Sequence, residues 1–187
     1  MPLAEFTAAF PDLCRRLLVS RRADRVGQAY LFVGDSPALL RRFVTAWAQV
    51  RACLTPRPDG DACGTCELCV RLANNTYPER VDLVPESKTR QILVDAMRTF
   101  DHRLNLSTDA AHPKIGVIAE ADCMGNEAQN AFLNRAGRAE VEHKNFALLA
   151  DAMDPAHPLL DAHGISRQVE VDQCVGELQV AALAARL

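Results

Sequence analysis

The stretch "AYLFVGDSPALLRRF", from Ala29 to Phe43, predicts a strand, a turn and then a helix. Its first part is a continuous apolar run, which is typical of a strand in a parallel sheet covered by helices on both faces. Pro37 favours a helix start, because the N–H group that proline lacks would have no partner in the first turn. From there, apolar residues recur at the spacing of one helix face: Leu40, Phe43, Val44, Trp47 and Val50. The stretch is therefore a strand–loop–helix unit.

The loop of this unit lies where many proteins bind the phosphates of a nucleotide, but its residues depart from the phosphate-binding pattern. That pattern, GxxxxGK[ST], needs a second glycine, a lysine for the phosphates and a hydroxyl for magnesium. Gly34 opens the loop, whereas the three later positions are Leu39, Leu40 and Arg41. Pro37 also removes one backbone donor. Either this is an ordinary turn or it is a nucleotide loop that no longer binds its ligand.

The strand-then-helix pattern recurs along the chain. Further strands are predicted in "VDLVPE" (81–86), "KIGVIAEA" (114–121), "NFALLADA" (145–152) and "SRQVEV" (166–171). Strands that alternate with helical segments predict an α/β fold with a parallel sheet flanked by helices and right-handed crossovers. Residues 172–187 are predicted as a helix that leads out of the sheet. We therefore expect a sheet domain over 1–171 and the start of a helical lid domain over 172–187.

Four of the seven cysteines lie in one short insertion, at Cys53, Cys63, Cys66 and Cys69. Each Cys-x2-Cys step suits two thiolates that bind one tetrahedral ion. Free thiols or a redox pair are the alternatives. We favour a structural zinc module over 53–72, because four ligands close the coordination shell and leave no position for chemistry. The other three cysteines are expected to be buried apolar residues: Cys14, Cys123 and Cys174.

The charge of the chain limits its function classes. A formal net charge of -3 gives no bulk attraction to nucleic acid, which argues against a free-standing DNA-binding protein. The sequence holds no apolar run of membrane-spanning length, and its first residues lack the basic region of a signal peptide. We therefore expect a cytoplasmic protein with no membrane partner.

Taken in order, these motifs resemble the AAA+ domain of the bacterial clamp-loader subunits of DNA polymerase III, and within that family the delta prime type. The resemblance covers most of residues 28–171. It rests on "GQAYLFVG", the cysteine insertion, "KIGVIAEADCMGNEAQNAFL" and "LLDAHGISRQVEV". Family members continue into a helical lid and a collar domain, so the resemblance implies that this chain is truncated or shortened relative to them.

The resemblance also implies a degenerate ATPase site. ATP-hydrolysing members of the family have an intact phosphate loop and an Asp-Glu pair at the end of a second strand. Here the pair is Ala119 and Glu120, and an alanine cannot help to hold magnesium. Together with Leu40 and Arg41 in the loop after Gly34, both halves of the site are lost. We therefore expect no bound ATP or magnesium, and Glu120 is interpreted as a sheet-end carboxylate rather than a base.

A further implied site lies in "ISRQ". Ser166 and Arg167 match a Ser-Arg-Cys motif that presents an arginine finger to ATP on the neighbouring subunit, although Gln168 replaces the cysteine. The alternative interpretation is a surface arginine at the start of an edge strand.

The resemblance thus implies a non-catalytic, delta prime-like subunit that helps to load the sliding clamp onto primed DNA. Its partners would be gamma/tau-type and delta-type subunits, with indirect contact to the clamp and to primed DNA. One alternative is an active gamma-type ATPase, which Leu40 and Ala119 argue against. Another is a zinc-stabilised module that binds nucleic acid, which would need a basic surface near the cysteines. The arginines close to them in sequence are Arg51, Arg57 and Arg71.

Overall fold

The computed structural model describes residues 2–26, 29–34, 36–86, 90–106, 112–132, 151–152 and 180–186. In chain order its elements are η1 (Leu3–Phe6), α1 (Pro11–Arg22), β1 (Ala29–Val33), α2 (Pro37–Ala52), α3 (Glu67–Ala73), β2 (Arg80–Leu83), α4 (Val94–Asn105), β3 (Lys114–Ile118), η2 (Ala121–Cys123), β4 (Asp151–Ala152) and β5 (Val180–Arg186). Residues 126–132 are also helical.

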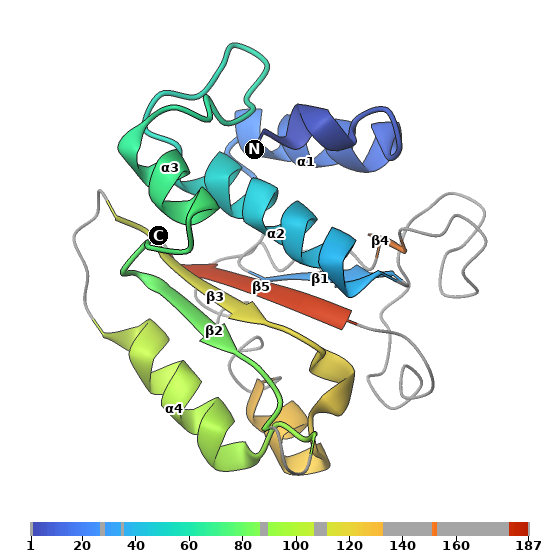
Figure 1. The fold of residues 1–187 in the computed structure, drawn as a ribbon, viewed down its shortest axis with the longest axis vertical. Helices are drawn as coiled ribbons and strands as arrows, with labels where there is room; N and C mark the ends of the chain where they lie inside the picture. Colours follow the sequence, from blue (N-terminus) through green and yellow to red (C-terminus); the bar gives the residue numbers. More distant parts are fainter. Residues whose placement is uncertain are drawn as a thin grey trace.

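Strand β1 lies in a sheet whose strand order is β2-β3-β5-β1-β4 (Figure 1). The pairs β1–β4 and β2–β3 are parallel. Strand β5 lies between them and is antiparallel to both β1 and β3, so that Phe32 is opposite Ala181 and Gly116 is opposite Ala184. The sheet is therefore mixed, with β5 joining two parallel pairs.

Two expectations from the sequence are wrong at β5. The sheet is not wholly parallel, and Val180–Arg186 is a strand of the sheet rather than part of a helical lid. Its sequence, "VAALAAR", is rich in alanine and favours a helix locally. Backbone pairing with two neighbouring strands overrides that preference, as tertiary context often does. The predicted domain boundary at 171 and the predicted strand 166–171 lie outside the described residues.

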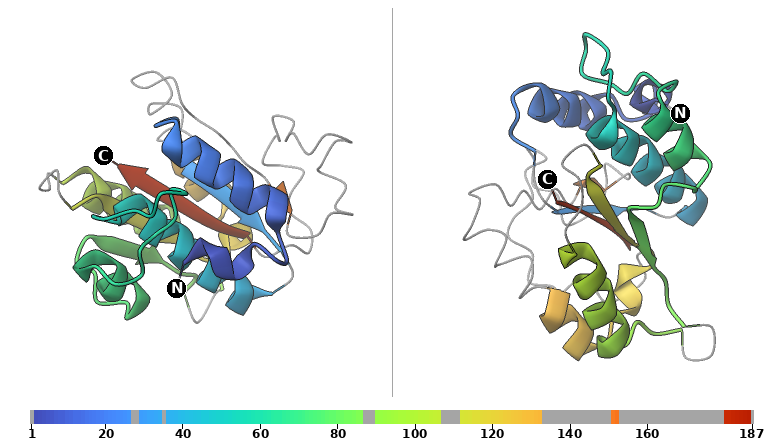
Figure 2. Two further views of the ribbon diagram at one scale, coloured as in Figure 1. Left: turned by 90° about the horizontal axis from the view of Figure 1, so that it is seen from above. Right: turned by 90° about the vertical axis from the view of Figure 1, so that its left-hand side faces the viewer.

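Helices cover both faces of the sheet, and β1 supplies side chains to both of the resulting cores. Helices α1, α2 and α3 lie on one face, and α4 with the 126–132 helix lies on the other (Figure 2). Tyr30 and Phe32 belong to the core under α2, whereas Leu31 and Val33 contact the core on the α4 side. Because successive side chains of a strand point to opposite faces, a strand between two cores must be apolar throughout. This explains the continuous apolar run of β1.

Helix α2 begins and packs as its sequence predicts. Ser36 caps it by accepting a hydrogen bond from the Leu39 N–H at 3.4 Å, and Pro37 occupies its first turn. The five residues of the predicted apolar face are buried. An aromatic cluster holds the helix against β1, with Phe32–Phe43 and Tyr30–Trp47 ring centroids each 5.2 Å apart in edge-on geometry.

Gly116 of β3 provides a test of the packing between the sheet and α4. A Cβ atom at this position would lie 2.6 Å from Cζ of Phe100 and 2.7 Å from Cδ1 of Leu104. We expect Gly116→Ala to lower the free energy of unfolding by about 1–3 kcal/mol, because overpacking displaces buried side chains. Urea unfolding followed by circular dichroism measures this change.

The matched control is Gly125→Ala. The atom nearest to a Cβ there would be the backbone oxygen of Ile92 at 4.0 Å, so the added methyl has room. We expect this control to lose less stability. An equal or greater loss for Gly125→Ala would contradict the packing argument.

Candidate metal centre and nucleotide-site positions

The four clustered cysteines come from the end of one helix, the loop after it and the start of the next helix. Cys53 directly follows α2, and Cys63 lies in the loop. Cys66 is the residue before α3, and Cys69 lies within α3. The two helices are tied together beside the cluster, where Nε2 of Gln49 donates a buried hydrogen bond of 2.6 Å to the backbone oxygen of Cys69. The local fold therefore brings all four cysteines to one point.

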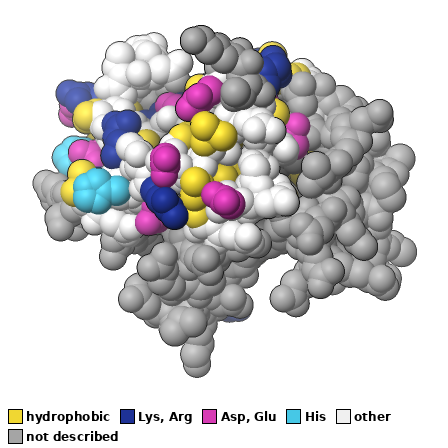
Figure 3. Space-filling model, turned by 90° about the horizontal axis from the view of Figure 1, so that it is seen from below, with side chains coloured by type: hydrophobic (Ala, Val, Ile, Leu, Met, Phe, Trp, Pro, Cys, Tyr) yellow, Lys and Arg dark blue, Asp and Glu magenta, His cyan; other side chains and the backbone are white. Residues whose placement is uncertain are grey.

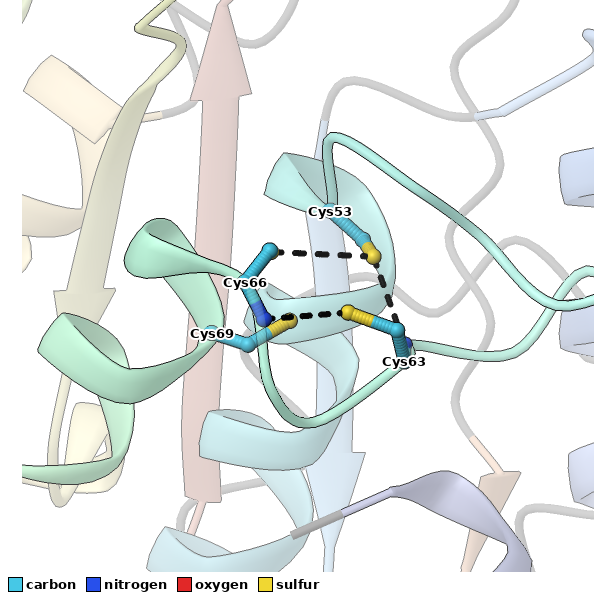
Figure 4. A group of neighbouring side chains, drawn as sticks. All are labelled: Cys53, Cys63, Cys66 and Cys69. Carbon is cyan, nitrogen blue, oxygen red and sulfur yellow. Dashed lines mark hydrogen bonds between the residues drawn. The ribbon is translucent and has the colours of Figure 1, made fainter.

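The sulfur atoms of the cluster are spaced as one tetrahedral ion requires (Figure 4). The four Sγ atoms lie within 4.8 Å of one another, and those of Cys53 and Cys66 are 4.0 Å apart. Four sulfurs at about 2.3 Å from a central ion would be about 3.8 Å from each other. All four cysteines are free, and 4.0 Å is far longer than a disulfide bond. The cluster could thus hold one metal ion with four thiolate ligands.

Backbone N–H groups point at the sulfurs of the cluster. The N–H of Cys63 donates to Sγ of Cys53 at 3.3 Å. The N–H groups of Thr65 and Cys66 donate to Sγ of Cys63 at 3.4 and 3.2 Å. The chain bends between them at Gly64, where φ is +76° and glycine avoids the strain of a side chain. Such bonds from outside the ligand set orient thiolates and stabilise their negative charge.

The surroundings of the cluster shift the pKa values of its thiols in opposite directions. Hydrogen bonding by Thr55, followed by the backbone N–H of Cys66, lowers the pKa of Cys63 to about 5. Burial raises the pKa of Cys53 and of Cys69. Without a cation, the two buried sulfurs therefore hold their protons at neutral pH. A metal ion must displace these protons when it binds, so its affinity falls as the pH falls.

The predicted nucleotide-site positions lie directly after β1, in the first turns of α2 and directly after β3. Gly34 directly follows β1, and Leu40, where the lysine would be, is 3% exposed in the core under α2. Nη2 of Arg41 lies 3.7 Å from Oε1 of Glu120. Ala119 comes directly after β3 and offers no side-chain ligand. The start of α2 therefore turns Leu40 into the core and directs Arg41 toward Glu120, which follows β3.

Glu120 is held by a second arginine that the sequence did not single out. Nη2 of Arg90 lies 2.9 Å from Oε2 of Glu120, whose backbone has the left-handed φ of 53°. The two carboxylate oxygens thus each face one arginine. No motif marks Arg90, because it reaches Glu120 from 30 positions away in the chain. The contact fits the interpretation of Glu120 as a sheet-end carboxylate.

The remaining predicted residues have mixed outcomes. Cys14 is buried as expected, whereas Cys123 is only partly buried. Ser166, Arg167 and Cys174 lie outside the described residues, so the predicted arginine finger stays a prediction.

Of the three arginines close to the cysteines in sequence, Arg57 is exposed, whereas Arg51 is buried and Arg71 is paired with an acidic residue. Arg51 is 8% exposed, and Arg71 pairs with Glu67 at 2.7 Å. Figure 3 shows the side of the molecule that carries α4, away from the cysteine cluster, and there acidic and basic side chains of the described residues are mixed. Nucleic-acid binding by the cysteine module therefore has little support. Among the described residues, no helix has both the length and the apolar character needed to cross a membrane.

An α/β sheet covered by helices, with a strand–loop–helix unit at β1, fits the AAA+-like class of domains. The chain matches the family described as "DNA polymerase III, delta subunit" over residues 10–135, more than half of its length, and belongs to this family. It is also 28% identical over 129 residues to DNA polymerase III subunit delta' of Escherichia coli (strain K12). That match covers 66% of this chain and 36% of the relative, so the chain spans just over a third of the relative's length. The resemblance drawn from the sequence is confirmed at the level of the family.

Metal analysis tests the cysteine cluster. We expect protein purified without chelator to carry about one zinc per chain, because the four sulfurs close a tetrahedral site. Cys66→Ser should lose most of the zinc and lower the melting temperature. Cys123→Ser, which changes a partly buried cysteine outside the cluster, should retain it. Metal-free wild-type protein with four titratable thiols in the cluster would contradict this prediction.

Proposed function

We propose that the full-length protein is a non-catalytic, delta prime-like subunit of the DNA polymerase III clamp loader. In this role it helps its ATP-hydrolysing neighbours to open the sliding clamp and to load it onto primed DNA. The observation that carries the proposal is the state of the nucleotide-site positions. Leu40 is buried in the core, and the side chain of Ala119 has no atom that could bind magnesium. The adjacent carboxylate of Glu120 faces two arginines.

Each of these features acts against a different part of a nucleotide site. A leucine at position 40 supplies no charge to the β- and γ-phosphates, and an alanine at 119 supplies no oxygen for magnesium. Glu120 would have to leave Arg41 and Arg90 before it could act on water. Since three separate functions are lost, the proposed role is structural, and neither ATP nor magnesium is a cofactor of this chain.

The proposed cofactor is one structural zinc ion, held by Cys53, Cys63, Cys66 and Cys69. Zinc suits the site because a set of four thiolates in tetrahedral array is its common structural environment. With four protein ligands the ion has no open position for a water or a substrate. Its proposed contribution is to hold the loop between α2 and α3 in place.

The proposed partners are the gamma/tau-type and delta-type subunits, with the clamp and primed DNA contacted through the assembled loader. Arg167, with Ser166 before it, is proposed to act in trans. A finger on a subunit without its own bound ATP can only serve a γ-phosphate on a neighbour. A guanidinium suits this task, because it stays charged and can bind two phosphate oxygens at once.

Calorimetric titration with Mg-ATP tests the proposed loss of the nucleotide site. We expect no saturable binding at micromolar ATP, since the charge and metal ligands of the site are missing. A gamma-type subunit from the same organism, measured in parallel, serves as the positive control. Micromolar affinity of this protein for ATP would contradict the proposal.

Reconstitution of the loader with the full-length subunit tests both the role and Arg167. We expect the complete mixture to load clamps on primed DNA, and a mixture that lacks this subunit to fail. Arg167→Ala should leave assembly intact and lower DNA-stimulated ATP turnover at the adjacent site. An arginine finger contributes about 10³ to 10⁵ in rate in other phosphoryl-transfer systems.

The control for this experiment is Arg98→Ala. Arg98 is an exposed arginine of α4, paired at 3.3 Å with Asp95 in the same helix, so its loss should change neither assembly nor turnover. Unchanged turnover with Arg167→Ala would return Arg167 to the status of a surface residue. Clamp loading without the subunit would refute the proposed role itself.

A further inference from the structure

A buried carboxylate connects the loop between α2 and α3, residues 53–66, to the start of the chain. This loop is called the cysteine loop below. Asp61 lies two residues before Cys63, and its side chain is fully buried. Oδ1 accepts hydrogen bonds from the backbone N–H groups of Leu3 at 3.0 Å and of Ala62 at 2.7 Å. Oδ2 accepts a bond of 2.9 Å from the N–H of Ala4. A buried carboxylate is costly unless its charge is met by such donors, so these bonds depend on the position of Asp61.

The cysteine loop fixes that position. The N–H of Cys63 binds Sγ of Cys53, which places the residues just before Cys63 against the end of α2. The turn before Asp61 is closed by a bond of 2.9 Å from the N–H of Arg57 to the oxygen of Asp61. At Gly60, φ is +88° and a Cβ atom would lie 2.8 Å from Cγ of Arg22, so the loop lies directly on α1.

The residues on the other side of Asp61 belong to the main core. Leu3 and Phe6 are buried, and the rings of Phe6 and Phe43 are 5.2 Å apart in edge-on contact. The backbone oxygen of Leu3 accepts from Sγ of Cys14 in α1 at 3.8 Å. The N-terminal segment, defined here as residues 2–10, therefore covers part of α1 and α2. Its first N–H groups are the ones that Asp61 binds.

We propose that Asp61 couples metal binding at the four cysteines to the packing of the N-terminal segment on α1 and α2. The proposal rests on the metal site proposed above. With the ion bound, the loop holds Asp61 beneath the first N–H groups of η1. When the ion leaves, the loop relaxes, these bonds are lost, and the N-terminal segment exchanges between packed and released positions. The metal site then controls how the start of the chain packs on α1 and α2.

Hydrogen exchange followed by mass spectrometry tests this coupling on the full-length chain. Four samples are compared: wild type and Asp61→Asn, each loaded with zinc and each after chelation, with zinc content measured on the same samples. We expect chelation of wild type to speed exchange in a peptide covering residues 2–10 by roughly tenfold or more, the range for hydrogen bonds to a charged group. Exchange over α4, which lies in the other core, should stay slow.

The key comparison is between the two proteins in each metal state. Asp61→Asn loaded with zinc should exchange as fast over residues 2–10 as chelated wild type, and its own chelation should add little, because both changes break the same link. Asp12→Asn, an exposed carboxylate of α1, is the matched control and should behave as wild type. This variant makes the same change in charge near the same segment.

Two results of the exchange measurement would overturn the coupling. One is unchanged exchange over residues 2–10 when zinc is removed from wild type. The other is equal loss of protection over α4, which would indicate global unfolding rather than release of the segment. Wild-type protein that never takes up zinc would refute the metal site itself and the coupling with it. That result leaves the proposed clamp-loader role to the reconstitution experiment, so the two failures are distinguishable.

Discussion

The burial of helix α2 is the constraint on which the rest of the structure depends. Phe43 and Trp47 fix the helix to the aromatic side chains of β1, and both are fully buried. A helix of 16 residues is about 24 Å long, so its two ends lie far apart. One end carries the loop after β1, and the other leads into Cys53. Because the helix cannot shift without disrupting the core, it fixes the loop after β1 and the cysteine cluster relative to the sheet.

The chain is held in place differently at the two ends of α2. At its start, the loop is short and Ser36 satisfies a free backbone N–H. At its end, the chain leaves the core and residues 54–59 are exposed, with little apolar surface to bury. A loop of this kind gains little from the hydrophobic effect, so cross-links must supply its order. Thiolates around one ion can do this, and Asp61 adds a polar attachment to the N-terminal segment.

The sequence predicted those features that depend on local patterns. The apolar run of β1, the apolar face of α2 and the grouping of the four cysteines all come from spacing along the chain, and the structure confirms them. Strand β5 was missed, because its alanine-rich sequence favours a helix and only pairing with β1 and β3 makes it a strand. Arg90 and Asp61 were missed for a related reason. Their partners are 30 and 58 positions away, and no spacing rule connects residues so distant.

The arrangement around Leu40 and Glu120 determines how costly it would be to build a nucleotide site at these positions. A lysine at position 40 would bring an ammonium group into a position that is 3% exposed, which is costly without a partner. A carboxylate at 119 would place a second negative charge next to Glu120, whose two oxygens are already matched to two arginines. Each substitution toward such a site is therefore unfavourable on its own. A nucleotide site here would therefore need several substitutions together, because each one alone disturbs contacts that the present residues make.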